Sequence, residues 1–320
     1  MTKTTLPTLL LLGAAALCLW PGCSTAQPPT QQYDQMAIQS SRHWLDIDYV
    51  GDGHIGHRLD IHLPVVERER YPVVICIYGS AFFSDNSKAA AFQTGLGQSL
   101  LENGFALVSI NHRSSREAIF PAQIQDVKAA IRFVRANADA FALDTSFVGI
   151  TGWSSGGHLA AMAGTTSDVR TYTLNGRRVD LEGALGRFTD QSSAVDAVVD
   201  WFGPTDFLIM DDCGSAMGHN AADSPESILV GGAIQAHPDA CWLANPASYV
   251  SNADPPFLIF HGDEDPLVPH CQSERLHQAL QGAGASSEFH LVEGGKHGPG
   301  VMIPAYYARM VGFFLGERNR

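Results

Sequence analysis

The stretch TGWSSGGHLA, residues 151–160, places two adjacent serines between glycines. Strand-like residues precede it and a helix-like segment follows it, so the serines lie where a strand turns into a helix. In a G-x-S-x-G turn the central serine is strained so that its hydroxyl is exposed, and small flanking residues let strand and helix approach. Gly152 and Gly156 flank Ser154 in this way. The pattern predicts Ser154 as the nucleophile of an acyl-transfer reaction.

The neighbouring Ser155 fits the same pattern less well. If Ser155 were the central residue, Trp153 and Gly157 would occupy the two small-residue positions, and tryptophan is far too large. A helix that begins just behind Ser154 presents free N–H groups, which favour developing negative charge. Ser154 is therefore the preferred candidate.

A serine hydroxyl needs a base, and the base needs an acid that orients it. His297 lies in the glycine-rich GGKHGPG, after the last strand-like segment, and is predicted as the base. The acid is predicted in HGDEDP, which also follows a strand-like segment. Asp265 is preferred because the proline after it presets a turn, and Asp263 remains the alternative because it can cap the same turn.

Acyl transfer also needs backbone N–H groups aimed at the oxygen of the tetrahedral intermediate. One donor is expected from Ser155, directly after the nucleophile. The other is expected from the loop YGSAFF, where small residues allow the main chain to approach a substrate. Ser80 and Ala81 are the predicted donors of that loop.

Several aromatic residues lie beside the predicted catalytic loops. Phe82, Trp153 and Trp201 are predicted to contact the substrate. Phe83 and Phe202 are further candidates, although Phe202 is expected to belong to the core.

The elements that position these residues alternate along the chain. The predicted strands are residues 44–50, 57–64, 71–79, 105–113, 147–152, 194–203, 255–262 and 286–295. The predicted helices are residues 91–104, 121–138, 156–166, 270–284 and 303–316. Such alternation predicts an α/β fold with a mostly parallel, doubly wound sheet covered by helices on both faces. Residues 206–248 are irregular and are expected to form part of a wall above the site.

With these residues placed, the chain resembles the α/β-hydrolase superfamily, and more narrowly the bifunctional feruloyl and acetyl-xylan esterases and the hormone-sensitive-lipase-like carboxylesterases. The resemblance rests on GWSSGGHLAAMAG, FPAQIQDVKAAIRFVRANA, PPFLIFHGDEDPLVPHCQSERL and EGGKHG. It implies the triad Ser154, Asp265 and His297, an acyl-enzyme mechanism, and no metal or organic cofactor. One departure is Tyr78-Gly79-Ser80-Ala81-Phe82, where relatives usually carry His-Gly-Gly-Gly or His-Gly-Gly-Ala before an aromatic residue.

Three functions compete. The first is an exported serine esterase that hydrolyses small-molecule or polysaccharide esters, above all acetyl or feruloyl esters of plant polysaccharides. The second is an exopeptidase of the prolyl-oligopeptidase type, which usually carries a large N-terminal propeller that the residues before the first central strand are too few to form. The third is a non-catalytic binding module on the same fold, which is expected to lack a triad member, and none is missing here.

The N-terminus has the features of an export signal. Lys3 gives a positive start, and an apolar run too short to span a bilayer comfortably follows at residues 9–20. Residues 1–26 are predicted as a signal peptide, with cleavage after Ala26 or before Cys23, where PGCS resembles a lipobox. The protein is therefore expected in the periplasm or outside the cell, and lipidation of Cys23 would attach it to the outer membrane. The remaining domain is predicted as a single unit over residues 42–320.

Export bears on the cysteines, because oxidising compartments permit disulfides. Cys213 and Cys241 flank the irregular insertion, and a bridge between them is one interpretation of their spacing, which alone does not define connectivity. Cys76 lies in an apolar strand and is expected to be a buried free thiol. The chain has no CxxC motif and no His-rich cluster, so no zinc site is predicted. The net charge is −13 and the 20 Lys and Arg residues are scattered, which argues against a nucleic-acid partner.

Overall fold

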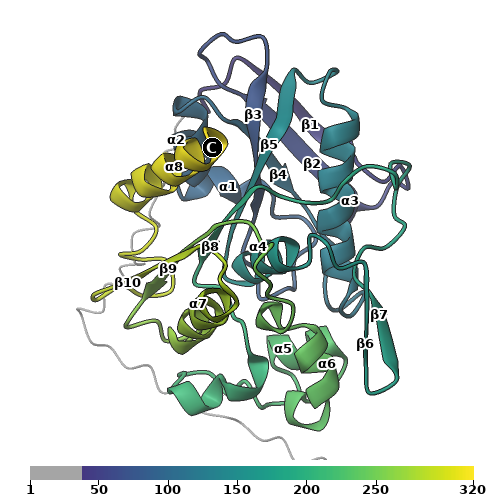
Figure 1. The fold of residues 1–320 in the computed structure, drawn as a ribbon, viewed down its shortest axis with the longest axis vertical. Helices are drawn as coiled ribbons and strands as arrows, with labels where there is room; N and C mark the ends of the chain where they lie inside the picture. Colours follow the sequence, from purple (N-terminus) through teal and green to yellow (C-terminus); the bar gives the residue numbers. More distant parts are fainter. Residues whose placement is uncertain (1–37) are drawn as a thin grey trace, which may run out of the picture. The chain divides into compact units, whose positions relative to one another are not determined.

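An eight-stranded sheet forms the centre of the computed structural model, which describes residues 38–320 (Figure 1). The strand order is β1-β2-β4-β3-β5-β8-β9-β10. The strands are β1 (Arg42–Asp48), β2 (Arg58–Leu63), β3 (Tyr71–Ile77), β4 (Ala106–Ile110), β5 (Leu143–Trp153), β8 (Ala197–Trp201), β9 (Phe257–Gly262) and β10 (Ser287–Val292). All of the predicted strands are present. The predicted signal peptide and Cys23 lie outside the described residues.

Strands β4, β3, β5, β8, β9 and β10 run parallel, and only β1 and β2 are antiparallel to their neighbours. Every residue of β3, β4, β8 and β9 is buried, as their continuous apolar runs predict. Because the carboxyl ends of parallel strands meet at one edge, the loops after β3, β5, β8, β9 and β10 converge there. The mostly parallel sheet is confirmed.

Helices cover both faces of the sheet (Figure 1). They are α1 (Ala90–Gln93), α2 (Leu96–Glu102), α3 (Ala122–Ala136), α4 (Ser155–Thr165), α5 (Pro225–Val230), α6 (Pro238–Leu243), α7 (Cys271–Ala283) and α8 (Pro304–Arg318). The core side chains of α3, α4 and α7 belong to one hydrophobic cluster, and those of α2 and α8 belong to the other. The single helix predicted over residues 91–104 is divided into α1 and α2, because Gly95 adopts a left-handed conformation with φ of 85°.

A second, two-stranded sheet lies outside the prediction. It is a hairpin of β6 (Thr171–Leu174) and β7 (Arg177–Asp180). Its turn residues Asn175 and Gly176 both have positive φ, of 49° and 80°. Asn-Gly between two alternating segments is the usual signal for such a turn, so the hairpin was predictable from the sequence.

The irregular segment after β8 contains α5, α6 and several turns of 3-10 helix. It packs against the loop that follows β9, where the Ala216 N–H donates to the Pro266 carbonyl over 2.9 Å. In the same place Ser215 Oγ and His219 Nε2 lie 3.0 and 2.9 Å from the carbonyl oxygen of Leu267. The insertion therefore supports the loop that carries the predicted acid.

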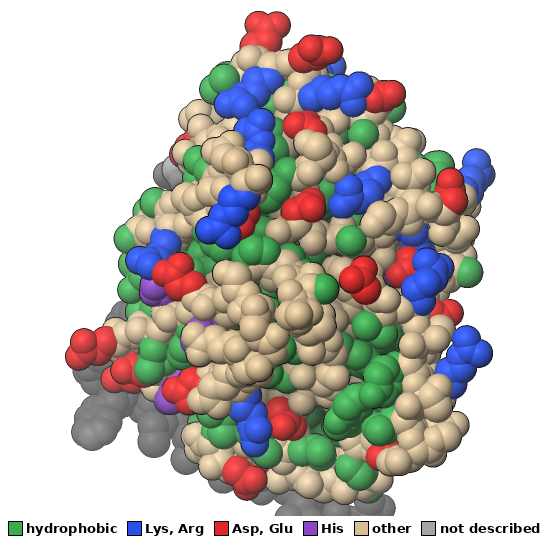
Figure 2. Space-filling model, viewed as in Figure 1, with side chains coloured by type: hydrophobic (Ala, Val, Ile, Leu, Met, Phe, Trp, Pro, Cys, Tyr) green, Lys and Arg blue, Asp and Glu red, His purple; other side chains and the backbone are tan. Residues whose placement is uncertain are grey.

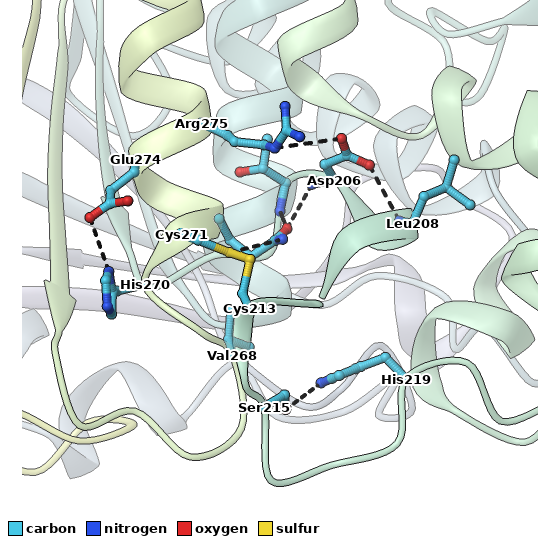
Figure 3. Close-up of a disulfide and its surroundings, with 12 residues drawn as sticks. Asp206, Leu208, Cys213, Ser215, His219, Val268, His270, Cys271, Glu274 and Arg275 are labelled. Atoms are coloured by element: carbon cyan, nitrogen blue, oxygen red, sulfur yellow. Dashed lines mark hydrogen bonds and ion pairs between the residues drawn. A yellow bond between two sulfur atoms is a disulfide. The ribbon is translucent and has the colours of Figure 1, made fainter. Parts of the chain in front are cut away.

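The interpretation that Cys213 pairs with Cys241 is wrong. Cys213 forms a disulfide with Cys271, at the first turn of α7 (Figure 3). Cys241 is a free cysteine on the inner side of α6, 1% exposed and part of the core. Spacing did not reveal this pairing because the start of α7 approaches the insertion only in the folded chain. Cys76 is buried and free, as predicted.

Within residues 38–320, no helix is both long enough and apolar enough to span a bilayer.

Removal of the disulfide should destabilise the domain. The bond joins residues separated by 58 positions, so the Cys213→Ser/Cys271→Ser variant should lose about 2–4 kcal/mol of unfolding free energy in urea titrations. Peptide mapping without reductant should link Cys213 to Cys271 and should find Cys241 alkylated only after unfolding. The Cys241→Ala variant is the control, because it should keep the link. A Cys213–Cys241 peptide would contradict the assignment.

Candidate active site

Ser154 occupies the turn between β5 and α4 in a strained conformation. Its φ is 54° and its ψ is −126°, a region that residues other than glycine rarely adopt. Its N–H donates to the carbonyl of Trp201, at the end of the neighbouring strand β8, over 2.9 Å. Helix α4 begins with the next residue, so the hydroxyl stands at the helix N-terminus.

Glycines around this turn have no room for a side chain. A Cβ on Gly156 would lie 2.2 Å from the carbonyl oxygen of Ile77, and one on Gly152 would lie 2.3 Å from that of Gly156. A Cβ on Gly79 would lie 2.8 Å from Cβ of Ser154 itself. The small residues predicted around Ser154 are therefore required by contacts between backbones.

Ser154, His297 and Asp265 form one hydrogen-bonded line at the carboxyl edge of the sheet. The Nε2 atom of His297 lies 3.0 Å from Oγ of Ser154. Its Nδ1 atom lies 2.7 Å from Oδ2 of Asp265. These are the contacts that a nucleophile, a base and an orienting acid require.

Asp265, rather than Asp263, contacts His297. The Oδ1 atom of Asp265 accepts hydrogen bonds from the N–H groups of Leu267 and Val268, over 2.9 and 3.0 Å. Asp263 is exposed and accepts instead from the Gly294 N–H, over 2.7 Å. The alternative acid thus serves to hold two loops together.

A second histidine also contacts the acid. His261, at the end of β9, is fully buried, and its Nε2 lies 3.4 Å from Oδ2 of Asp265 and 2.8 Å from the Val268 carbonyl oxygen. Burial raises the pKa of Asp265, but the interactions with His261 and His297 outweigh burial and hold the pKa well below its usual value. Asp265 therefore remains a carboxylate while it holds His297. His261 is not among the predicted site residues, although it directly precedes the acid loop in HGDED.

The prediction that the Ser80 N–H points at the reacting oxygen is wrong. That N–H donates to Oγ of Ser155 over 2.9 Å and so ties the loop after β3 to the first turn of α4. Among the described residues, the N–H groups of Ala81 and Ser155 have no hydrogen-bond partner. Ala81 has a φ of 53°, and Ser155 opens α4. These two are the available donors.

Two of the three predicted substrate contacts lie in the core. Trp201 is fully buried, stacks on Phe260 with ring centroids 4.4 Å apart, and donates from Nε1 to the Thr151 hydroxyl. Phe82 is 1% exposed and packs edge-on against His158. Their loops reach the catalytic edge, but their side chains point inward. Trp153 is partly exposed and remains a candidate contact.

Phe202 is buried in the core, as predicted, and it also packs on the base. Its ring centroid lies 4.7 Å from that of His297, and its backbone has a φ of 45°. Positive φ at a bulky residue is uncommon and persists only where the surroundings impose it. The Phe202 ring limits the tilt of the imidazole that faces Ser154.

Another carboxyl lies beneath the start of α4. Burial raises the pKa of Asp200 to about 7, although the Gly203 N–H donates to it over 2.9 Å. Its Oδ1 atom occupies the space where a Cβ on Gly157 would lie, at 2.2 Å. Burial thus favours the uncharged form of Asp200, which limits the negative charge behind Ser154.

A methyl group at Gly156 should disrupt the turn. Gly156→Ala places Cβ against the carbonyl oxygens of Ile77 and Tyr78. It should therefore lower the unfolding free energy by about 3 kcal/mol or more. Gly312→Ala, on the exposed side of α8 with nothing within 4 Å, is the matched control and should stabilise by about 0.5–1 kcal/mol. Urea titrations of both variants check this. Equal effects would show that the close contacts carry no cost.

The depressed pKa of Asp265 makes its contribution to stability depend on pH. The pKa of an unfolded aspartate is about 3.9. The stabilisation that the Asp265 carboxylate contributes is therefore present above that pH and is lost as the pH falls through the pKa of the folded state. Asp265→Asn should therefore lower the unfolding free energy more at pH 7 than at pH 3. Asp223→Asn, at an exposed residue, is the control. A difference from wild type that is constant with pH would contradict the assignment.

Comparison with known proteins agrees with this geometry. A sequence profile of the BD-FAE family matches residues 59–280. Esterase LipQ of Mycobacterium tuberculosis is 32% identical over 244 residues, which cover 76% of this chain and 53% of LipQ. Esterase LipC of the same organism is 32% identical over 260 residues, which cover 78% of this chain and 59% of LipC. The chain thus spans little more than half the length of these curated relatives.

Two solved structures are more similar. A truncated form of a carbohydrate esterase from gut microbiota is 47% identical, with a TM-score of 0.86 over 89% of this chain and 99% of that one. A bifunctional GH43-CE protein of Bacteroides eggerthii is 51% identical, with a TM-score of 0.82 over 86% of this chain and 35% of that one. The matched profile and the fold agree: the chain belongs to the BD-FAE family and has the α/β-hydrolase fold.

Proposed function

We propose that this protein is a serine carboxylesterase that cleaves acetyl or feruloyl esters of plant polysaccharides. The observation that carries the proposal is the hydrogen-bonded line of Ser154, His297 and Asp265 beside two N–H donors that have no hydrogen-bond partner in the described part of the chain. This arrangement supplies a nucleophile, a base, an orienting acid and stabilisation of an oxyanion.

In the proposed mechanism, Ser154 Oγ attacks the ester carbonyl while His297 Nε2 takes its proton. The carbonyl oxygen becomes negatively charged and is stabilised by the N–H groups of Ala81 and Ser155. Asp265 accepts the hydrogen bond from Nδ1 and stabilises the imidazolium. His297 then protonates the departing alcohol, and water attacks the acyl-enzyme with His297 again as base, which releases the acid and restores Ser154.

The class of substrate is inferred from the similar structures. One is a carbohydrate esterase and the other carries the designation GH43-CE, and each is close to half identical to this chain. We therefore propose that the alcohol part of the ester is a carbohydrate hydroxyl.

Export belongs to the same proposal. The apolar run at residues 9–20 supports a cleaved leader, and PGCS supports lipidation of Cys23 as the alternative to simple secretion. The Cys213–Cys271 disulfide adds independent support, because structural disulfides persist mainly in oxidising compartments. A polysaccharide substrate is also met outside the cell.

Ser154→Ala should reduce ester hydrolysis by roughly 10⁴-fold or more, because the remaining groups have no nucleophile to activate. The substrates are 4-nitrophenyl acetate, butyrate and octanoate, methyl ferulate, acetylated xylan and a proline anilide. Ser167→Ala, just beyond the other end of α4, is the matched control and should keep wild-type rates.

Each outcome of this assay assigns a function. Preference for acetylated xylan or for methyl ferulate selects the acyl group. Cleavage of the anilide alone would overturn the proposal in favour of a peptidase. A folded wild-type protein without any turnover would support the binding module instead.

A further inference from the structure

An open cleft of about 300 Å³ lies between the hairpin β6–β7, the helix α6 and the segment that follows β8. This volume is at the lower end of the range for small-molecule sites. On the face shown in Figure 2, hydrophobic side chains gather over α6 and the adjoining hairpin. None of the residues proposed to carry the chemistry lines the cleft.

Trp242 of α6 forms an aromatic wall of the cleft. It is partly exposed, and its ring is held from behind by Tyr172 of the hairpin and by Tyr249, with ring centroids 5.0 and 5.8 Å away. Because both neighbours are also packed against each other, the indole is fixed before any ligand arrives. The exposed part of a fixed indole ring can stack on a ligand that presents a flat surface made largely of C–H groups.

Polar side chains surround this aromatic wall. Asp206, Asp239, Asn175 and Asn245 line the cleft beside Trp242, and Leu174, Leu208 and Pro238 complete its lining. The Nδ2 group of Asn175 donates to Oδ1 of Asp239 over 3.0 Å, which orients both side chains on the rim. Within the described residues, Asp239 Oδ2 and Asn245 Nδ2 make no hydrogen bond. An aromatic plane with carboxylates and amides beside it matches a pyranose, which has a C–H face and hydroxyls at its edge.

The cleft connects to the candidate active site through one stretch of chain. Trp201 accepts the hydrogen bond from the Ser154 N–H, Phe202 packs on His297, and the chain then continues to Asp206 on the rim. Five residues span at most about 18 Å, so the rim lies within reach of an oligosaccharide whose ester is bound beside Ser154.

We infer that this cleft is a subsite for a sugar unit of the polysaccharide that carries the ester, remote from the scissile bond. The inference rests on the proposed function, because it takes the substrate to be a carbohydrate ester. The subsite contributes binding along the chain and no chemistry. It therefore distinguishes polymeric substrates from small esters.

Trp242→Ala should raise KM for acetylated xylan by about tenfold and leave its kcat unchanged, which corresponds to about 1.4 kcal/mol of binding. Turnover of 4-nitrophenyl acetate should equal that of the wild type, which also shows that the variant is folded. Trp242→Phe should retain most of the affinity. Trp44→Ala removes a partly exposed tryptophan from the distant edge strand β1 and is the matched control. If Trp242→Ala does not fold, Asn175→Ala on the exposed hairpin tip tests the same rim.

Binding without hydrolysis separates this inference from the proposed function. The probe is an unacetylated xylo-oligosaccharide titrated into the Ser154→Ala protein by calorimetry, with and without Trp242→Ala. Loss of binding with Trp242→Ala supports the subsite, even if the wild type cleaves no carbohydrate ester and the proposed function fails. Unchanged binding, or an unchanged KM for a polymer that the wild type does cleave, would overturn the subsite and leave the proposed function standing.

Discussion

The contact between the start of α4 and the ends of β3 and β5 is the constraint on which the site depends. At Gly156 and Gly152 the backbones lie so close together that the turn between strand and helix has no room for a side chain. Ser154 absorbs the strain as a positive φ, and its hydroxyl is thereby fixed beside His297. Within residues 38–320, the N–H of Ser155 has no partner at the helix N-terminus, so one packing arrangement positions both the proposed nucleophile and a proposed oxyanion donor.

A second set of contacts holds Asp265, the proposed acid. Asp265 is held by two N–H groups of its own loop and by His261. That loop is in turn braced by the insertion, through hydrogen bonds to Pro266 and Leu267. The disulfide anchors the insertion to α7, whose Gln272 accepts from the backbone of Thr205 and Asp206. The orientation of His297, the proposed base, thus depends on a segment far from it in the sequence.

Features with local causes could be predicted from the sequence, and features set by tertiary contacts could not. The buried strands follow from apolar runs, and Ser154 follows from the glycines required around it. The role of oxyanion donor predicted for Ser80 is wrong because the Ser80 N–H donates to Oγ of Ser155. This contact forms only in the folded chain. The substrate contact predicted for Trp201 is wrong because the direction of its side chain depends on the register of β8 against β5. The disulfide partner interpreted for Cys213 is wrong because Cys271 approaches it only in the folded chain. The hairpin is different, since Asn175-Gly176 is a local signal that is sufficient to predict it.

The hairpin β6–β7 pairs with itself and shares no ladder hydrogen bonds with the central sheet. Its tip residues Asn175 and Gly176 are exposed, and the space around Gly176 is open. Sequence change there is therefore uncoupled from the strained turn and from the register of the strands that carry Ser154 and Asp265. Such separation lets the surface of the proposed subsite change in sequence without moving the proposed reacting groups.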